Sequence, residues 1–199
     1  MDFFDLFQIL SLVAFYAVFV GRTLMLMSRG VKVFMLGVGK KGPRAWLERV
    51  FMAALLLWSA QIVVQALHLP RILPGWLHEP LFVWIPAQAA GAVMISGGLA
   101  LFVAALVSFG RSWRVGIDIG SPGALVTGGA FSLSRNPIFL FMDAMFISTF
   151  LINGSPFFLA AAAITVTGVH WQILQEERFL QGYYGKAYAD YRAAVRRYI

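Results

Sequence analysis

Residues 137–174 read PIFLFMDAMFISTFLINGSPFFLAAAAITVTGVHWQIL, and this stretch decides the fold. Two apolar segments, residues 137–152 and 157–174, flank the turn-forming sequence Asn153-Gly154-Ser155-Pro156. A helix of about 20 apolar residues crosses the hydrocarbon core of a bilayer, and a somewhat shorter one still fits. We therefore expect an antiparallel helical hairpin within a membrane.

The rest of the chain extends this pattern. Of its 199 residues, 60% are hydrophobic and only 13% are charged, which excludes a soluble globular domain. Residues 6–27, 50–69 and 81–109 are further apolar segments of spanning length. The fold class expected is all-α, a polytopic membrane bundle of about five transmembrane helices. It forms one structural domain, with residues 1–104 as housing, residues 105–199 as the cofactor-binding and catalytic part, and a helical cytosolic tail from residue 175.

Charge predicts the orientation. Lysine and arginine concentrate in the connections after the first and third segments and in the tail, whereas Arg71 stands alone on the opposite side. The positive-inside rule then places the N-terminus outside and the tail in the cytoplasm. We expect an integral protein of a bacterial-type inner membrane with its active site facing the cytoplasm. The net charge of +7 follows from this bias, so no nucleic-acid partner is expected.

Glycines and a helix start give more local predictions. Gly91, Gly97 and Gly98 favour close packing of the third segment against another helix. Asn136-Pro137 is typical of a helix N-terminus, where asparagine caps free N–H groups and proline occupies the first position. The same helix end, with Arg135 beside it, is also suited to an anionic ligand group. Capping alone is the simpler interpretation of Asn136.

Acidic residues and a histidine are the remaining candidates for chemistry. Because residues 137–174 form a hairpin, Glu176 should return to the membrane face that holds Arg135, although paired glutamates are also common on solvated helices. Asp143 and His170 lie within the two apolar segments, where ionisable groups are often functional. They should lie about one helical turn apart in depth, either as part of a site or as a structural polar contact. No metal-binding motif is present, and there are no cysteines.

Five motifs occur in a specific order. They are Leu125-Val126-Thr127-Gly128, Arg135-Asn136-Pro137, Glu176-Glu177-x-x-Leu180, Tyr184-Gly185-x-x-Tyr188-x-x-Tyr191 and Val195-Arg196. In this order they resemble the isoprenylcysteine carboxyl methyltransferase and phospholipid methyltransferase family, over roughly residues 105–199. Members of that family are integral membrane enzymes that use S-adenosylmethionine.

The resemblance implies a set of site residues. Cofactor contacts carried over by position are Ala124, Leu125, Val126, Phe131, Asn136, Pro137, Ile138, Phe139 and Glu176. We assign Arg135 and Glu176 as catalytic, with Arg135 orienting an anionic group, and Asp143, His170 and Gln172 to the substrate side. Three departures from the family pattern stand out: Asn136 replaces a histidine, Phe131 replaces a tyrosine, and Gln172 replaces the arginine of the isoprenylcysteine branch.

Together these features predict a membrane methyltransferase. Its donor is S-adenosylmethionine, and its partners are the bilayer and a lipophilic acceptor, either a phospholipid amine or an isoprenylcysteine-like carboxylate. Two alternatives stay open from the residues alone. One is a transporter or channel subunit with Asp143 and His170 on its pathway, and the other is an enzyme resembling sterol reductases.

Overall fold

The computed structural model describes residues 1–33, 43–70, 73–110, 113 and 123–199. All regular elements within these ranges are helices, which confirms the expected all-α class. In chain order they are α1 (Phe3–Met27), α2 (Pro43–Ala66), α3 (Gly75–His78), α4 (Ile85–Phe109), the 3₁₀ turn η2 (Gly129–Ser132), α5 (Pro137–Asn153), α6 (Pro156–Tyr184) and α7 (Lys186–Ala194).

Each of the five predicted apolar segments is helical. Among the described residues, α1, α4 and α6 are long and apolar enough to cross a membrane, and α2 and α5 contribute the shorter apolar stretches Val50–Ala66 and Pro137–Asn153. Large apolar side chains point outward: Val93, Val107 and Ile164 are each more than 70% exposed. Such a surface is expected where lipid surrounds the protein. The number of spans and the sidedness stay predictions.

Small residues allow α4 and α5 to pack closely. A Cβ atom added to Gly91 would lie 2.8 Å from the backbone oxygen of Ser148, and one on Gly98 would lie 3.2 Å from Cβ of Ala144. Nothing lies within 4 Å of the corresponding position at Gly97. The packing role predicted from sequence is therefore confirmed for Gly91 and Gly98 and wrong for Gly97.

Aromatic rings connect the helices in the bundle interior. Phe102 of α4 stacks on Phe141 of α5 with ring centroids 4.5 Å apart, and Phe15 of α1 lies 5.5 Å from the same ring of Phe141. Trp58 of α2 stacks on Phe146 of α5 at 4.4 Å. These contacts give α5 a central position, packed against α1, α2 and α4 as well as its hairpin partner.

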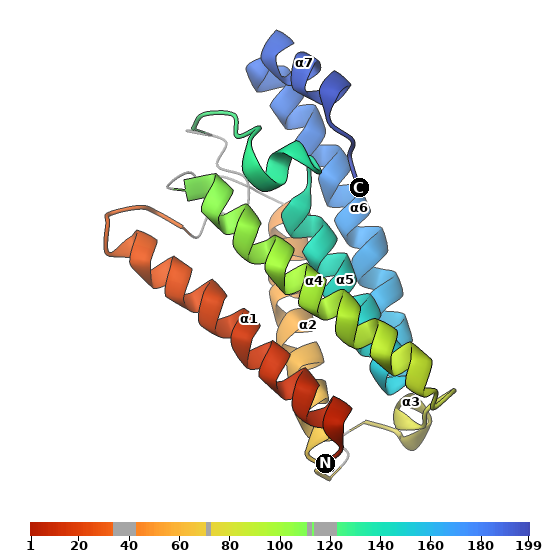
Figure 1. Ribbon diagram of the computed structural model, residues 1–199. Coiled ribbons are helices and arrows are strands. Elements are labelled where there is room, and N and C mark those ends of the chain that lie inside the picture. Colours follow the sequence, from red (N-terminus) through yellow and green to blue (C-terminus); the bar gives the residue numbers. More distant parts are fainter. Residues whose placement is uncertain (34–42, 71–72, 111–112, 114–122) are drawn as a thin grey trace.

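The α5–α6 hairpin forms as predicted. Its turn contains Gly154 in the left-handed conformation with φ of 63°. A Cβ atom there would lie 2.2 Å from the backbone oxygen of Phe82, and the Gly154 oxygen accepts a 2.7 Å hydrogen bond from Leu81 N, so only glycine fits. The hairpin returns the chain to the end of the bundle that carries η2 and α7, opposite the N-terminus and α3 (Figure 1).

Several helix ends differ from the ends of the predicted segments. Helix α6 runs without a break from the predicted apolar segment into the predicted helical tail and ends at Tyr184. Helix α2 begins at Pro43 instead of residue 50, and α4 begins at Ile85 instead of residue 81. The polar residues that end the apolar segment therefore do not end the helix, and the predicted tail is the last part of α6 plus α7. The basic residues Lys40, Lys41, Arg71, Arg111 and Arg114, used in predicting the sidedness, lie outside the described residues.

Candidate functional site

A buried carboxylate joins three segments at the α7 end of the bundle. Glu177 of α6 is 7% exposed. Its Oε1 accepts a hydrogen bond from Arg135 Nη2 at 2.9 Å, and its Oε2 accepts one from Arg197 Nη2 at 2.8 Å. Arg197 Nε adds a further contact to Oε1 at 3.1 Å. Charge-assisted bonds in a fork geometry are among the stronger hydrogen bonds in proteins. We call Arg135, Glu177 and Arg197 the arginine–glutamate clamp.

Arg135 also binds the chain beyond α7. Its Nη1 donates to the backbone oxygens of Arg192 at 3.0 Å and Val195 at 3.2 Å, and its backbone N donates to Arg196 O at 3.0 Å. The remaining side-chain nitrogen, Nε, is buried and has no partner among the described residues. Arg135 therefore holds the end of the chain, and one N–H group is left for another acceptor.

Asn136 does not act as the predicted cap. It stands at the N-cap position of α5, but its side chain accepts no capping hydrogen bond. Its Nδ2 instead donates to Arg197 O at 3.2 Å and lies 3.5 Å from Oε1 of Glu177. The side chain of Asn136 binds the carbonyl oxygen of Arg197 instead of the N–H groups at the start of α5, so the predicted cap was wrong.

A second, apolar cluster lies next to the clamp. Phe131 is buried there with Tyr188 and Tyr191, and Leu125, Val126 and Ile138 pack against them. Tyr191 Oη donates to the backbone oxygen of Phe131 at 2.7 Å, which fixes the segment around η2 against α7. Burial raises the pKa of Tyr191 to about 12, so this phenol stays neutral at physiological pH.

The structure thus brings together many of the residues predicted to contact the cofactor. Leu125, Val126, Phe131 and Ile138 meet in the apolar cluster. Ala124 is exposed at its edge, Pro137 is buried at the start of α5, and Phe139 is half-buried outside the cluster.

Glu176 lies on α6 directly before the clamp glutamate. It is half-buried, and its negative charge reaches Tyr188. Burial, followed by the charges of Glu177 and then Glu176, raises the pKa of Tyr188 to about 12. Glu176 therefore lies near Tyr188 at the clamp end of α6, a position compatible with the predicted cofactor contact. The role itself stays a prediction.

Sequence analysis did not single out Glu177 or Arg197. A signal for Glu177 exists, since Val169, Ile173 and Glu177 repeat every four residues and all three are buried on one face of α6. Arg197 lies in a nonhelical end segment and carries no comparable local pattern.

An open groove of about 500 Å³ lies farther along α5 and α6. Its lining residues are Asp143, Val166, Thr167, His170 and Tyr198. Asp143 and His170 were expected close together, and both line this groove. No hydrogen bond joins them within the described residues; His170 Nδ1 instead pairs with the hydroxyl of Tyr198, and one carboxylate oxygen of Asp143, Oδ1, is buried without a partner. Gln172, the third predicted substrate-side residue, is half-buried and does not line the groove.

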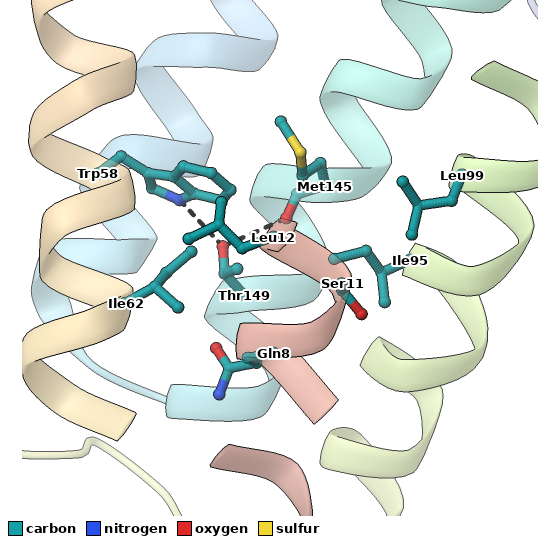
Figure 2. Close-up of a pocket in the computed structure, with 9 residues that line it drawn as sticks. All are labelled: Gln8, Ser11, Leu12, Trp58, Ile62, Ile95, Leu99, Met145 and Thr149. Atoms are coloured by element: carbon teal, nitrogen blue, oxygen red, sulfur yellow. Dashed lines mark hydrogen bonds between the residues drawn. The ribbon is translucent and has the colours of Figure 1, made fainter. Parts of the chain in front are cut away.

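A second cavity lies deep in the bundle and is too small for a substrate. It holds about 10 Å³, roughly the space of one water molecule. Figure 2 shows its lining from α1, α2, α4 and α5, where Trp58 Nε1 donates to Thr149 Oγ1 at 3.2 Å. The residues that line it are Gln8, Ser11, Leu12, Trp58, Ile62, Ile95, Leu99, Met145 and Thr149. It is a small void between the housing helices and α5.

The described side chains provide no group of three histidine, cysteine, aspartate or glutamate residues that could hold a metal ion. The candidate site consists of three neighbouring parts along the hairpin: the apolar cluster, the arginine–glutamate clamp and the groove.

Comparison with known proteins gives one match. A family model described as phospholipid methyltransferase matches residues 86–187, just over half of the chain. The match runs from the first turn of α4 into α7 and includes Arg135, Glu177 and most of the groove. It also includes the apolar cluster except for Tyr188, Tyr191 and Val195, which lie after residue 187. No curated protein and no solved structure matches the chain.

Proposed function

The chain belongs to the phospholipid methyltransferase family, and on that premise we propose that it moves a methyl group from S-adenosylmethionine to the amine of a lipid headgroup. The family makes the chain a membrane methyltransferase. The donor, the acceptor and the residues assigned to each are the proposal.

The residues that line the groove favour an amine over a carboxylate as the methyl acceptor. The described residues that line it include one carboxylate, Asp143, and no lysine or arginine. A positively charged ammonium group within about 4 Å of a carboxylate gains roughly 1 kcal/mol in water and about 4 kcal/mol near a protein surface. A carboxylate acceptor would instead be repelled. Gln172, where the isoprenylcysteine branch has an arginine, favours the same choice.

The residues of the apolar cluster suit the cofactor by chemical type. Leu125 and Val126 are partly exposed and offer apolar surface for an adenine ring, and the carboxylate of Glu176 can accept hydrogen bonds from ribose hydroxyls. The unpartnered Nε of Arg135 is a buried donor that an anionic group of a bound ligand would satisfy. These properties support the assignment of this region to the donor.

S-adenosylmethionine supplies, when bound, a methyl group on a positively charged sulfur. The chain itself then has to align the acceptor, exclude water and remove a proton, because a protonated amine has no lone pair for attack. Asp143 holds the amine by charge. Asp143 or the imidazole of His170 takes the proton, since both line the groove. The clamp keeps the two ends of the hairpin in register.

The donor assignment is tested by binding of labelled S-adenosylmethionine to the purified protein. We expect Glu176→Ala to weaken binding about tenfold to a hundredfold, as loss of one charge-assisted hydrogen bond of about 1.5–3 kcal/mol implies. Asp190→Ala is the matched control, because Asp190 lies on α7 in an exposed pair with Lys186. No binding by the unmodified protein, or equal affinities of the two variants, contradicts the assignment.

The same measurement separates the alternatives drawn from sequence. A transporter or channel subunit moves solute across vesicles and binds no methyl donor, and a reductase requires a nicotinamide cofactor. The family match supports neither of them.

A further inference from the structure

The five residues after α7 fold back along the bundle. We call residues 195–199 the C-terminal strap. Figure 1 shows the C-terminus beside α6, below α7. Arg197 contacts Glu177 and Tyr198 contacts His170, so the strap runs antiparallel to α6. Backbone contacts hold it: Arg135 N donates to Arg196 O at 3.0 Å, and Ser134 Oγ donates to Arg197 O at 3.0 Å.

The clamp fixes the middle of the strap. Both oxygens of Glu177 receive bonds from Arg197, and Asn136 Nδ2 donates to the backbone oxygen of Arg197 at 3.2 Å. The strap is thus bound through its backbone and through the ion pair of Arg197 with the buried carboxylate of Glu177. Such a segment is a poor candidate for a frayed terminus.

The clamp delivers the next residue, Tyr198, into the groove. Tyr198 lines the groove together with Asp143 and His170. Its ring stacks on that of His170 with an interplanar angle of 26° and centroids 6.1 Å apart, and its hydroxyl pairs with Nδ1. His170 lies seven residues before Glu177 on α6, about 10 Å along the helix axis. The strap therefore spans from the clamp to the groove.

The bond to Tyr198 determines what His170 can do. An imidazole with Nδ1 engaged has only Nε2 left for a ligand. If the tyrosine hydroxyl donates to Nδ1, then Nε2 carries the proton and donates; if Nδ1 carries the proton, then Nε2 accepts. In both cases one hydrogen bond and one stacked ring hold an otherwise exposed side chain in place.

We propose that the C-terminal strap forms one wall of the acceptor groove and that Tyr198 is a positioning residue, which orients His170 toward the amine headgroup. This inference rests on the proposed function for the identity of the acceptor. It assigns a role to a segment that lies after residue 187, where the family match ends.

The test compares Tyr198→Phe with Tyr183→Phe. The first variant keeps the ring and removes the hydroxyl that pairs with His170; the second removes a hydroxyl from an exposed tyrosine of α6. We expect Tyr198→Phe to raise KM for an aminophospholipid about threefold to tenfold, with the affinity for S-adenosylmethionine unchanged. Tyr183→Phe should change neither. If Tyr198 had only a structural role, Tyr198→Phe would lower the stability of the protein and would not change KM for the lipid while leaving the affinity for S-adenosylmethionine unchanged.

A binding measurement keeps the inference testable without turnover. The full-length protein in vesicles of phosphatidylglycerol is labelled with a photoreactive phosphatidylethanolamine, with and without excess unlabelled phosphatidylethanolamine. We expect competable labelling of peptides around Asp143 and His170, reduced about threefold or more by Tyr198→Phe and unaffected by Tyr183→Phe.

Releasing the strap provides a second variant. Arg197→Ala removes one arm of the clamp and leaves Tyr198 unchanged. We expect Tyr198 to orient His170 only while Arg197 holds the strap in place. The double variant Arg197→Ala/Tyr198→Phe should therefore be labelled no more weakly than Arg197→Ala alone. Additive losses would show that Tyr198 acts independently of the strap.

The outcomes distinguish the two proposals. Labelling by the lipid that depends on Tyr198, in a protein that binds no S-adenosylmethionine, supports the groove and overturns the proposed function. Equal labelling of Tyr198→Phe and Tyr183→Phe overturns the role of the strap, whatever the activity. Loss of donor affinity in Tyr198→Phe also overturns it, because the strap would then act on the donor.

Discussion

Replacing Glu177 by alanine should release the tail from the bundle. The substitution removes the acceptor that Arg135 and Arg197 share. The side chain of Arg135 is 7% exposed, so its charge stays buried without a counterion; that of Arg197 is 33% exposed and can turn to water. Breaking a buried ion pair by removing one partner costs about 3–5 kcal/mol. Since only Arg135 keeps its charge buried, we expect the substitution to destabilise the docked tail by about 3 kcal/mol, the lower end of this range.

Limited proteolysis reads this loss directly. Trypsin cleaves after lysine and arginine, and Lys186, Arg192 and Arg196 are exposed on α7 and the strap. When cleavage requires a local opening, its rate follows the population of the open form. A cost of about 3 kcal/mol corresponds to roughly 150-fold faster cleavage in the tail. Asp190→Ala, which breaks only the exposed pair with Lys186, should change the rate little. Cleavage of Glu177→Ala at the rate of the control would refute the structural role of the clamp.

Two further predictions concern packing and pH. Gly91→Ala should lower the melting temperature in detergent, because its Cβ would meet the Ser148 carbonyl at 2.8 Å and overpacking costs about 1–3 kcal/mol; Gly97→Ala, with nothing within 4 Å, should not. Burial raises the pKa of Tyr188 and of Tyr191 from 10.0 to about 12, so their contribution to stability is complete below pH 10 and is lost between pH 10 and 12. Phenolate absorbance should show two tyrosines titrating near pH 12, and titration of every tyrosine with a midpoint near pH 10 would contradict their burial.

Features encoded locally were predictable from sequence. The hairpin of α5 and α6 follows from two apolar segments around Gly154, whose turn only glycine accommodates. The packing of Gly91 and Gly98 follows from small residues in an apolar helix, although the sequence alone does not show that Gly97 faces away from α5. Hydropathy marks where the apolar segment ends, at residue 174, and does not show that α6 runs unbroken into the predicted helical tail. Gln175, Glu176, Glu177 and Arg178 are good helix formers, so the helix continues past that point.

Features set by distant residues were not predictable. Asn136 has the sequence context of a cap, yet its partners are Glu177 and Arg197, 41 and 61 residues away. Of the two adjacent glutamates, the clamp uses the second because α6 presents it on the face of Val169 and Ile173. Tyr198 enters the groove only because the strap folds back, which no periodicity indicates.

The proposed reaction is methyl transfer to a lipid amine at this end of the bundle. The most direct measurement incubates the purified protein, in vesicles of phosphatidylethanolamine and phosphatidylglycerol, with methyl-labelled S-adenosylmethionine, and then identifies the labelled lipid. We expect label on the ethanolamine nitrogen and a strong reduction in the Asp143→Asn variant. Label that appears only as a carboxyl ester on a different acceptor, or no transfer by a protein that binds the donor, would contradict it.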